Sequence, residues 1–263
     1  MTGGHLRLSN VKVIRGGRSI LAVEDMQIRQ GEFVGVIGTN GAGKTTLMKV
    51  CCGLIKPNMG AVRFDGRDLT KLTAWRKANV RKHIGYIPQA AEYNAELPFT
   101  LREIVAMGRT SIKPLLWPLN KEDYEVVDNW IDKMDLSQQR SQTFRSLSGG
   151  EQQKALIARA MAQDPKILML DEPCSNLDFN WKYQITEIIE QLHRQNKITI
   201  MMVSHETNLI PAGCKRAVLL HEGRVLADGD IEEILEAGVL EKAYQCRLDI
   251  LNFAGRRYTV NKS

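Results

Sequence analysis

The chain has 263 residues, of which 43% are hydrophobic and 25% charged, and its formal net charge is +6. This length and balance suit a globular protein with one large domain, or a core with a subdomain. No apolar run approaches the roughly 18 residues that span a bilayer, and the first ten residues do not resemble a secretory signal. We therefore expect a chain that stays in the cytoplasm.

A short apolar run at residues 33–37 predicts a buried strand, and the residues from Thr45 onward have the composition of a helix. The segment between them, GTNGAGKTT, satisfies the pattern G-x-x-x-x-G-K-[ST]. Its glycines let backbone N–H groups curl around phosphate oxygens, and the helix N-terminus adds its dipole. We expect Lys44 to reach the β- and γ-phosphates and Thr45 to ligate magnesium. The predicted phosphate-binding residues are Gly38, Thr39, Asn40, Gly41, Ala42, Gly43, Lys44, Thr45 and Thr46.

The densest basic stretch covers residues 67–83, RDLTKLTAWRKANVRKH. A solvated surface is the favoured interpretation, and contact with an anionic membrane leaflet or a membrane partner is the second. Nucleic acid is the least favoured, because the stretch lacks the series of interleaved aromatic residues that stacks bases. The five cysteines form no CxxC pair and have no histidines at metal-ligand spacing, so we expect reduced, mostly packed thiols.

Polar residues follow three further apolar runs. HIGYIPQ ends in Gln89, KILMLDEP contains Asp171 and Glu172, and ITIMMVSHE ends a strand at Ser204 and His205. Alone, paired acids at a strand end indicate a turn, and a single histidine there indicates a cap or core residue. Because carboxyl ends of parallel strands meet at one sheet edge, we expect these side chains beside the phosphate loop. Asp171 is then the candidate magnesium carboxylate, and Glu172 could accept a proton from an attacking water.

A resemblance to a known family, carried by the motifs quoted below, implies a core at about residues 1–88 and 155–230, an inserted helical subdomain at 89–154, and a C-terminal tail at 231–263. The tail is expected to close the last helix of the core and to add a small strand pair. Only one phosphate loop occurs, and no internal repeat is visible. The whole chain is therefore predicted to form a single domain with one insertion.

The insert begins with AEYNAELPFT, which is expected to be an exposed loop. Thr100 and Glu103 predict a capping box for the helix that follows. Pro114 and Pro118 break the helices after it. The apolar cluster between these prolines is interpreted as core, slightly ahead of the alternative that it is a docking surface; it comprises Leu115, Leu116 and Trp117.

A second helix start suited to an anion occurs at Ser148, Gly149 and Gly150, in the segment LSGGEQQKALIARAMA. The apolar residues that follow it, among them Leu156 and Ile157, fall on one helical face. The chain already has a complete phosphate loop elsewhere. This second helix start therefore needs another phosphate as its ligand.

In this order, GTNGAGKTT, Gln89, LSGGE, LMLDEP, SNLD and VSH closely resemble the ATP-binding cassette proteins, and the resemblance covers nearly the whole chain. It implies an α/β fold: a RecA-like P-loop ATPase core with an antiparallel β subdomain and an inserted α-helical subdomain. It also implies that two copies sandwich ATP head to tail. The helix that starts at Ser148, Gly149 and Gly150 would then face the γ-phosphate on the partner's P-loop.

The resemblance implies an ATPase that uses ATP and Mg²⁺. Glu172 would be the general base and His205 the switch that contacts the γ-phosphate. Gln89 would reach the metal or the water and sense a membrane partner, and residues 175–178 would communicate across the dimer. The implied magnesium ligands are Thr45, Gln89 and Asp171.

Three positions depart from the family pattern. Around residues 13–17, where the family often has an aromatic residue that stacks on adenine, this chain offers only Arg15, whose guanidinium stacks less strongly. Glu151 replaces the commoner glutamine in the first helical turn, where the helix dipole tolerates an acid well. Cys174 replaces a small hydroxyl residue. None of the three is a predicted catalytic group, so an active ATPase is expected.

LPFTLREIVAMGRT and the C-terminal segment look like those of importers for metal ions, iron chelates, haem or cobalamin. The leading hypothesis is the ATPase of an importer for iron-siderophore, haem, cobalamin, zinc or manganese. Its expected partners are a second copy, integral membrane permease subunits and an external substrate-binding protein, with no nucleic acid. The expected location is peripheral, on the cytoplasmic face of the inner membrane.

Two alternatives stay open: the ATPase of an exporter, and a soluble ATPase of the cluster-assembly type. A plain P-loop kinase or GTPase would leave LSGGEQQ and the Ser204–His205 pair unexplained. No residue of such a cassette is expected to contact the transported molecule, so the cargo itself is not predicted.

Overall fold

The computed structural model describes residues 4–89, 98–114, 116–253 and 256–262. These residues form a ten-stranded sheet in the order β5-β4-β1-β2-β10-β9-β3-β8-β7-β6 and a separate two-stranded sheet, β11-β12. The strands of the large sheet are β1 (Leu6–Arg15), β2 (Arg18–Ile28), β3 (Phe33–Gly38), β4 (Met59–Phe64), β5 (Arg67–Asp68), β6 (Ile84–Ile87), β7 (Ile167–Asp171), β8 (Thr199–Val203), β9 (Arg216–His221) and β10 (Arg224–Asp230).

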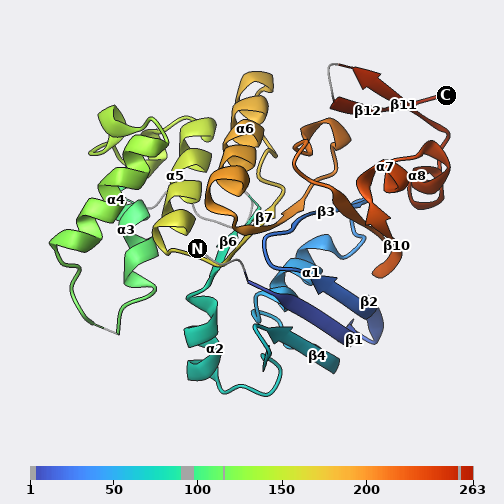
Figure 1. Cartoon of the computed structure of the whole chain (residues 1–263), viewed down its shortest axis with the longest axis horizontal. Helices are drawn as coiled ribbons and strands as arrows, with labels where there is room; N and C mark the ends of the chain where they lie inside the picture. Colours follow the sequence, from blue (N-terminus) through green and yellow to red (C-terminus); the bar gives the residue numbers. More distant parts are fainter. Residues whose placement is uncertain (1–3, 90–97, 115, 254–255, 263) are drawn as a thin grey trace.

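The helices gather into layers around this sheet (Figure 1). They are α1 (Lys44–Cys51), α2 (Ala74–Arg81), α3 (Leu101–Thr110), α4 (Lys121–Lys133), α5 (Gly149–Ala162), α6 (Phe179–Asn196), α7 (Ile231–Ile234) and α8 (Ala237–Tyr244). Short 3₁₀ turns are η2 (Ser137–Gln139), η3 (Phe144–Ser146) and η4 (Thr207–Leu209). No helix in the described ranges is long and apolar enough to cross a bilayer.

The strands β9, β3, β8, β7 and β6 run parallel and are buried on both faces. In β3, Phe33 and Ile37 pack with α3 to α6, whereas Val34 and Val36 pack with α1 and the antiparallel strands. Continuous burial on both faces explains why these segments read as unbroken apolar runs and not as an alternating pattern. The predicted strands at residues 33–37 and 167–170 are confirmed.

The other half of the sheet is antiparallel. β1 pairs with β2 on one side and with β4 on the other, and β4 pairs with β5. Helix α1 lies between these strands and the parallel half, and its buried residues Leu47 and Met48 belong to the core that joins them. The expected antiparallel β subdomain on an α/β core is therefore confirmed.

Helices α3, α4 and α5 form a separate layer, seen beside α6 in Figure 1. Thr100 caps α3, accepting a hydrogen bond from the Glu103 amide, while the Glu103 carboxylate accepts one from Thr100 N, so the predicted capping box is confirmed. The described residues between Thr110 and Lys121, where the two prolines were expected to end helices, form no helix. Helix α5 crosses the proposed boundary at residue 155 and packs against both α3 and α6, so that boundary stays a prediction.

The core interpretation of the apolar cluster before Pro118 is wrong for two of its members. Leu116 is 93% exposed and Trp117 is 67% exposed. Leu115 lies outside the described residues, as do residues 91–97 of the loop expected to open the insert. Hydrophobicity alone predicted burial, but no described element covers the connection between α3 and α4.

The tail contains α7, α8 and the hairpin β11 (Leu248–Phe253) and β12 (Arg256–Asn261), so the predicted strand pair is confirmed. The hairpin lies over η4, the turn that follows β8. Of the cysteines, Cys51, Cys52, Cys174 and Cys214 are buried, in agreement with packed thiols. Burial raises the pKa of the Cys174 thiol to about 11.

Candidate functional site

The phosphate loop joins the carboxyl end of β3 to α1. Gly38 ends the strand at a φ of +154°, and a Cβ at this position would overlap the carbonyl oxygen of Leu220 in β9. Gly43 precedes α1 with a φ of +95°, a left-handed conformation that disfavours a residue with a side chain. These two glycines therefore have backbone reasons for their places in the motif, besides access to phosphate.

Lys44 opens α1 and is only 5% exposed. Its Nζ donates hydrogen bonds to the carbonyl oxygens of Gly38 at 2.9 Å and Thr39 at 3.0 Å, so the ammonium group curls back over the loop. Burial lowers the pKa of Lys44, and the nearby charges of Glu172 and Asp171 oppose that effect. A buried cation at the mouth of a glycine loop is suited to phosphate oxygens.

Two carboxylates lie at the end of β7. Asp171 is the last residue of the strand and is fully buried, and Tyr86 Oη donates to its Oδ2 at 3.4 Å. Glu172 follows with a φ of +51°, a left-handed conformation that is strained for a residue with a side chain. This strained conformation ends the strand and places the Glu172 carboxylate in the cavity that Lys44 also lines.

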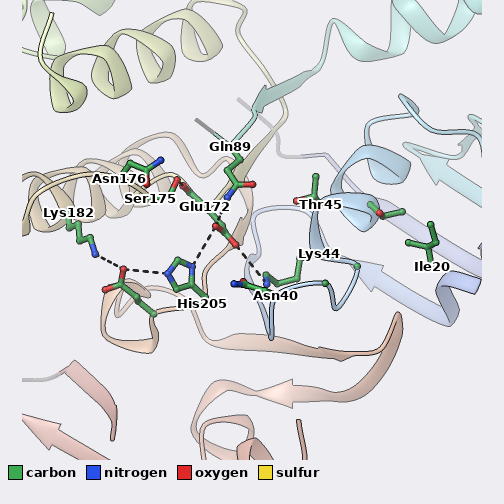
Figure 2. Close-up of a pocket in the computed structure, with 14 residues that line it drawn as sticks. Ile20, Asn40, Lys44, Thr45, Gln89, Glu172, Ser175, Asn176, Lys182 and His205 are labelled. Carbon is green, nitrogen blue, oxygen red and sulfur yellow. Dashed lines mark hydrogen bonds and ion pairs between the residues drawn. The ribbon is translucent and has the colours of Figure 1, made fainter. Parts of the chain in front are cut away.

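The Glu172 carboxylate is the meeting point of the predicted catalytic groups (Figure 2). Gln89 Nε2 donates to its Oε2 at 2.9 Å, and Lys44 Nζ lies 3.8 Å from its Oε1. His205 Nδ1 lies 3.6 Å from Oε2. The structure thus brings together side chains that follow three strands and one that opens α1, as the shared sheet edge predicted.

These groups border a cavity of about 620 Å³. Its lining residues are Ile20, Asn40, Gly41, Gly43, Lys44, Thr45, Thr46, Gln89, Glu172, Ser175, Asn176, Lys182, His205 and Glu206. The predicted Gly38, Thr39, Ala42 and Asp171 are not among them. Sequence reasoning missed Ile20, Lys182 and Glu206, which belong to no motif.

Arg15 is exposed at the end of β1 and is not among the residues that line the cavity. Ile20, at the start of β2, lines it instead, at the end of the cavity away from His205 (Figure 2). The adenine contact of Arg15 therefore stays a prediction. Ile20 is an apolar residue within an ordinary strand pattern, so nothing in the sequence indicated that it would line the cavity.

The second helix start lies outside this cavity. Ser148 caps α5 through a capping box: its Oγ accepts from the Glu151 amide, and its own amide donates to Glu151 Oε2 at 2.8 Å. Ser148 and Gly149 are exposed. None of Ser148, Gly149 and Gly150 lines the chain's own cavity, so this helix start is available to a phosphate held elsewhere.

A phosphate loop between β3 and α1, with paired acids at the end of a neighbouring parallel strand, defines a P-loop nucleotide-binding domain of the α/β class. The family model for ABC transporter matches residues 22–175, and the chain belongs to this family of ATP-hydrolysing cassettes. The class of protein predicted from the motifs is therefore the class to which the family model assigns the chain.

Two relatives cover most of the chain. It is 33% identical over 238 residues to the petrobactin import ATP-binding protein FpuC of Bacillus anthracis, spanning 90% of this chain and 86% of the relative. It is 31% identical over 254 residues to the ferric enterobactin transport ATP-binding protein FepC of Escherichia coli, spanning 96% and 92%. Both relatives are named as ATP-binding proteins of transport systems.

Solved structures share the fold. A dimeric ATP-binding cassette in a post-hydrolysis state, bound to ADP and Pi, superposes with a TM-score of 0.76 at 25% identity, covering 86% of this chain and 98% of that one. A chain of an ABC transporter in an inward-facing conformation superposes with a TM-score of 0.83 at 23% identity, covering 99% and 98%. The second likeness extends over the C-terminal tail as well as the core.

Proposed function

We propose that this cassette powers the import of a metal ion or metal chelate, with Glu172 as the general base of ATP hydrolysis. The observation that carries the catalytic part is the convergence of Gln89, Lys44 and His205 on the Glu172 carboxylate. The import part is supported by the names of the relatives, which include petrobactin, ferric enterobactin and zinc uptake systems.

In the proposed reaction the loop of residues 38–46 binds the triphosphate, and the Lys44 ammonium moves from the loop carbonyls to the β- and γ-phosphates. The Glu172 carboxylate accepts a proton from the attacking water, while the amide of Gln89 holds the carboxylate in orientation. His205 contacts the γ-phosphate from its place beside the Glu172 carboxylate. Its ring is 45% exposed, so it can turn toward a ligand without breaking the core.

The donor set of the site fits magnesium. Thr45 offers a hydroxyl, Gln89 an amide oxygen and Asp171 a carboxylate, and Mg²⁺ prefers such hard oxygen ligands with several positions left for water and phosphate. No cluster of three or more His, Cys, Asp or Glu side chains suited to a metal occurs among the described residues. Bound magnesium would supply charge neutralisation on the phosphates.

In a head-to-tail dimer, the exposed start of α5 would meet the nucleotide phosphate that the partner copy binds. The N-terminus of α5 at Ser148 and Gly149 would face the γ-phosphate on the partner's P-loop, and closure would exclude water from that site. Hydrolysis removes the charge that bridges the copies and lets them separate. The dimeric ADP-bound cassette that shares this fold supports the arrangement.

The permease partner would dock on the helical side of the cassette, at the cytoplasmic face of the membrane. A groove of about 410 Å³ lies between α2, β6, α3 and α5, with Arg81, Tyr86, Met107 and Arg159 among its lining residues. A groove with a mixed basic and apolar lining suits a short helix of a membrane subunit. An external substrate-binding protein would deliver the cargo to that permease.

The decisive experiment uses the full chain with Glu172→Gln. Loss of the general base should slow ATP turnover about 10²- to 10⁴-fold, with ATP binding retained. It should also trap an ATP-dependent dimer, measured by light scattering. Glu187→Gln, on an exposed position of α6, is the matched control and should turn over normally. Undiminished turnover by the Glu172→Gln variant would remove Glu172 from this role.

The same trapped variant, purified from its native host with ATP, tests transport. Co-purification of a polytopic permease, identified by mass spectrometry, supports the transporter, and a binding protein encoded beside it supports import over export. Recovery of soluble proteins alone, with the cassette washing freely from membranes, would favour the cluster-assembly alternative.

A further inference from the structure

The His205 ring lies between two carboxylates without a close hydrogen bond to either. Its Nδ1 is 3.6 Å from Glu172 Oε2, and its Nε2 is 3.7 Å from Glu206 Oε1. Both distances exceed the range of an N–H···O hydrogen bond. The imidazole is therefore close to two acids. It can contact a phosphate only while neither acid holds it in a hydrogen bond.

Lys182 pairs with Glu206, the acid that does not belong to the predicted catalytic residues. Its Nζ donates to Glu206 Oε1 at 2.6 Å, which is the same oxygen that faces His205 Nε2. The two side chains are 25% and 29% exposed, so solvent screens the pair only in part. Because a charge-assisted hydrogen bond already uses this oxygen, its attraction for the imidazole N–H is weakened.

Glu206 is also fixed through its backbone. Ser204 Oγ donates to Glu206 O at 2.8 Å, and Glu206 N donates back to Ser204 Oγ at 3.1 Å. This turn holds Glu206 beside His205 whatever its side chain does. From this position the Glu206 carboxylate faces both the ammonium group of Lys182 and the imidazole ring.

The turn of α6 that carries Lys182 is held firmly. Asp178 Oδ1 accepts a hydrogen bond from Trp181 N and so caps the helix. The backbone carbonyl of Lys182 accepts hydrogen bonds from Thr186 Oγ1 at 2.8 Å and from Cys174 Sγ at 3.6 Å. The Lys182 ammonium group therefore projects from a rigid helix end, and its contact with the Glu206 carboxylate is one of the dashed lines in Figure 2.

We propose that Lys182 is a positioning residue: by occupying the Glu206 carboxylate it keeps His205 free to contact the γ-phosphate. The proposal rests on the proposed function, in which His205 contacts that phosphate. Without Lys182, the unpaired Glu206 carboxylate would accept a hydrogen bond from His205 Nε2 and hold the ring away from the phosphate. Turnover should fall for this reason.

Lys182 also lines the cavity, so it could contact ATP directly. The two roles differ in their dependence on Glu206. A positioning lysine matters only while the Glu206 carboxylate is present, whereas a lysine that binds ATP matters on any background. A double-mutant cycle separates these cases, because it measures the coupling between the two residues.

The experiment measures kcat and KM for ATP in the full chain with Lys182→Met, Glu206→Gln and both changes together. Lys182→Met should lower kcat about ten-fold on the native background, with KM little changed, and less than about two-fold on the Glu206→Gln background. Lys182→Arg should restore most of the rate, because arginine keeps the charge-assisted hydrogen bond. An equal loss on both backgrounds, or a loss that appears in KM, would overturn the proposal.

Lys121→Met is the matched control, since it breaks an exposed ion pair with Glu125 far from the site. Thermal unfolding of each variant checks that lost turnover is not lost folding. The Glu172→Gln variant, measured in parallel, separates the two failures. If Glu172→Gln still hydrolyses ATP, the catalytic assignment is wrong; if only the Lys182 cycle shows no coupling, the positioning role alone is wrong.

Discussion

The indole ring of Trp181, in the first turn of α6, lies so close to Gly150, in the first turn of α5, that a Cβ at position 150 would overlap the ring. Lys154 Nζ sits over the same ring, 5.3 Å from its centroid. The two helices that begin at LSGGE and at SNLD are therefore joined by one aromatic side chain. A change at this contact reaches both helix starts.

Gly150→Ala should displace Trp181 and lower the free energy of unfolding by about 1–3 kcal/mol, the usual cost of overpacking. Gly149→Ala is the control, because a Cβ there would meet only Leu177 Cδ2 at an ordinary 3.4 Å. That variant should be neutral or more stable by up to about 1 kcal/mol, since alanine favours the helix. Urea unfolding compares them. Equal unfolding free energies for the two variants would show that the Trp181 ring can move aside at little energetic cost.

Much of the site followed from local pattern. GTNGAGKTT lies between a strand and a helix as predicted, and the polar residues after apolar runs lie at the same sheet edge, because parallel strands in one sheet end at one edge. Gln89, Glu172 and His205 met there for that reason. The burial of residues 33–37 and 167–170 on both faces was likewise readable as unbroken hydrophobicity.

What the sequence did not reveal depends on contacts between distant segments. Lys182 and Glu206 are 24 positions apart, and neither belongs to a motif, so nothing indicated their ion pair. The burial of Gly150 under Trp181 has the same origin. Leu116 and Trp117 show the reverse error: their hydrophobicity predicted a core that no described neighbour provides.

Glu151 places a negative charge in the turn expected to face the partner's γ-phosphate. Hydrogen bonds from the Ser148 hydroxyl and amide lower the pKa of Glu151, so the charge persists at neutral pH. Glu151→Gln keeps a capping side chain but removes this charge. The KM for ATP should fall about two- to five-fold, and the gain should shrink as salt is added.

Steady-state ATPase assays at low and high ionic strength check this effect. Glu122→Gln is the control, because it makes the same change in the first turn of α4, outside the cavity lining. A KM that is unchanged, or that falls equally in both variants, would mean that the start of α5 does not meet the phosphate.

Asp123 joins α3 to α4 from a buried position. Its carboxylate contacts Arg109 Nη2 at 2.9 Å and Lys113 Nζ at 2.7 Å. Burial raises its pKa, but hydrogen bonds from Lys113, the Asn120 amide and Arg109 outweigh that effect and hold the pKa at about 2. Because the folded pKa is depressed, the stabilisation is present at neutral pH and is lost as the pH falls toward 2.

Asp123→Asn should therefore lower the free energy of unfolding by about 3 kcal/mol at pH 7, since it leaves two cations beside a neutral group. The difference from the native chain should close between about pH 4 and pH 2. Denaturant unfolding at several pH values measures both. Glu125→Gln, at a 65% exposed carboxylate, should cost little at any pH. A gap that persists at pH 2 would contradict the assigned cause.

The C-terminal hairpin is tied to the turn after His205 by one buried hydroxyl. Thr207 Oγ1 lies 2.8 Å from Thr259 Oγ1 and 3.0 Å from the carbonyl oxygen of Arg257, to which it donates. Thr259→Val removes one of these links and should cost about 1 kcal/mol, whereas Thr207→Val removes both and leaves the partly buried Arg257 carbonyl without this donor. The hairpin should therefore loosen far more in the second variant.

Hydrogen exchange followed by mass spectrometry tests this difference. Peptides that cover β12 should exchange faster in Thr207→Val than in Thr259→Val, while peptides that cover β7 should be unchanged in both, because β7 is buried along its whole length and paired on both sides. Equal exchange in the two variants would assign the attachment to other contacts of the hairpin, such as the pairing of Arg257 with Glu232. If Thr207→Val also slows ATP turnover, the tail supports the turn that carries the switch histidine.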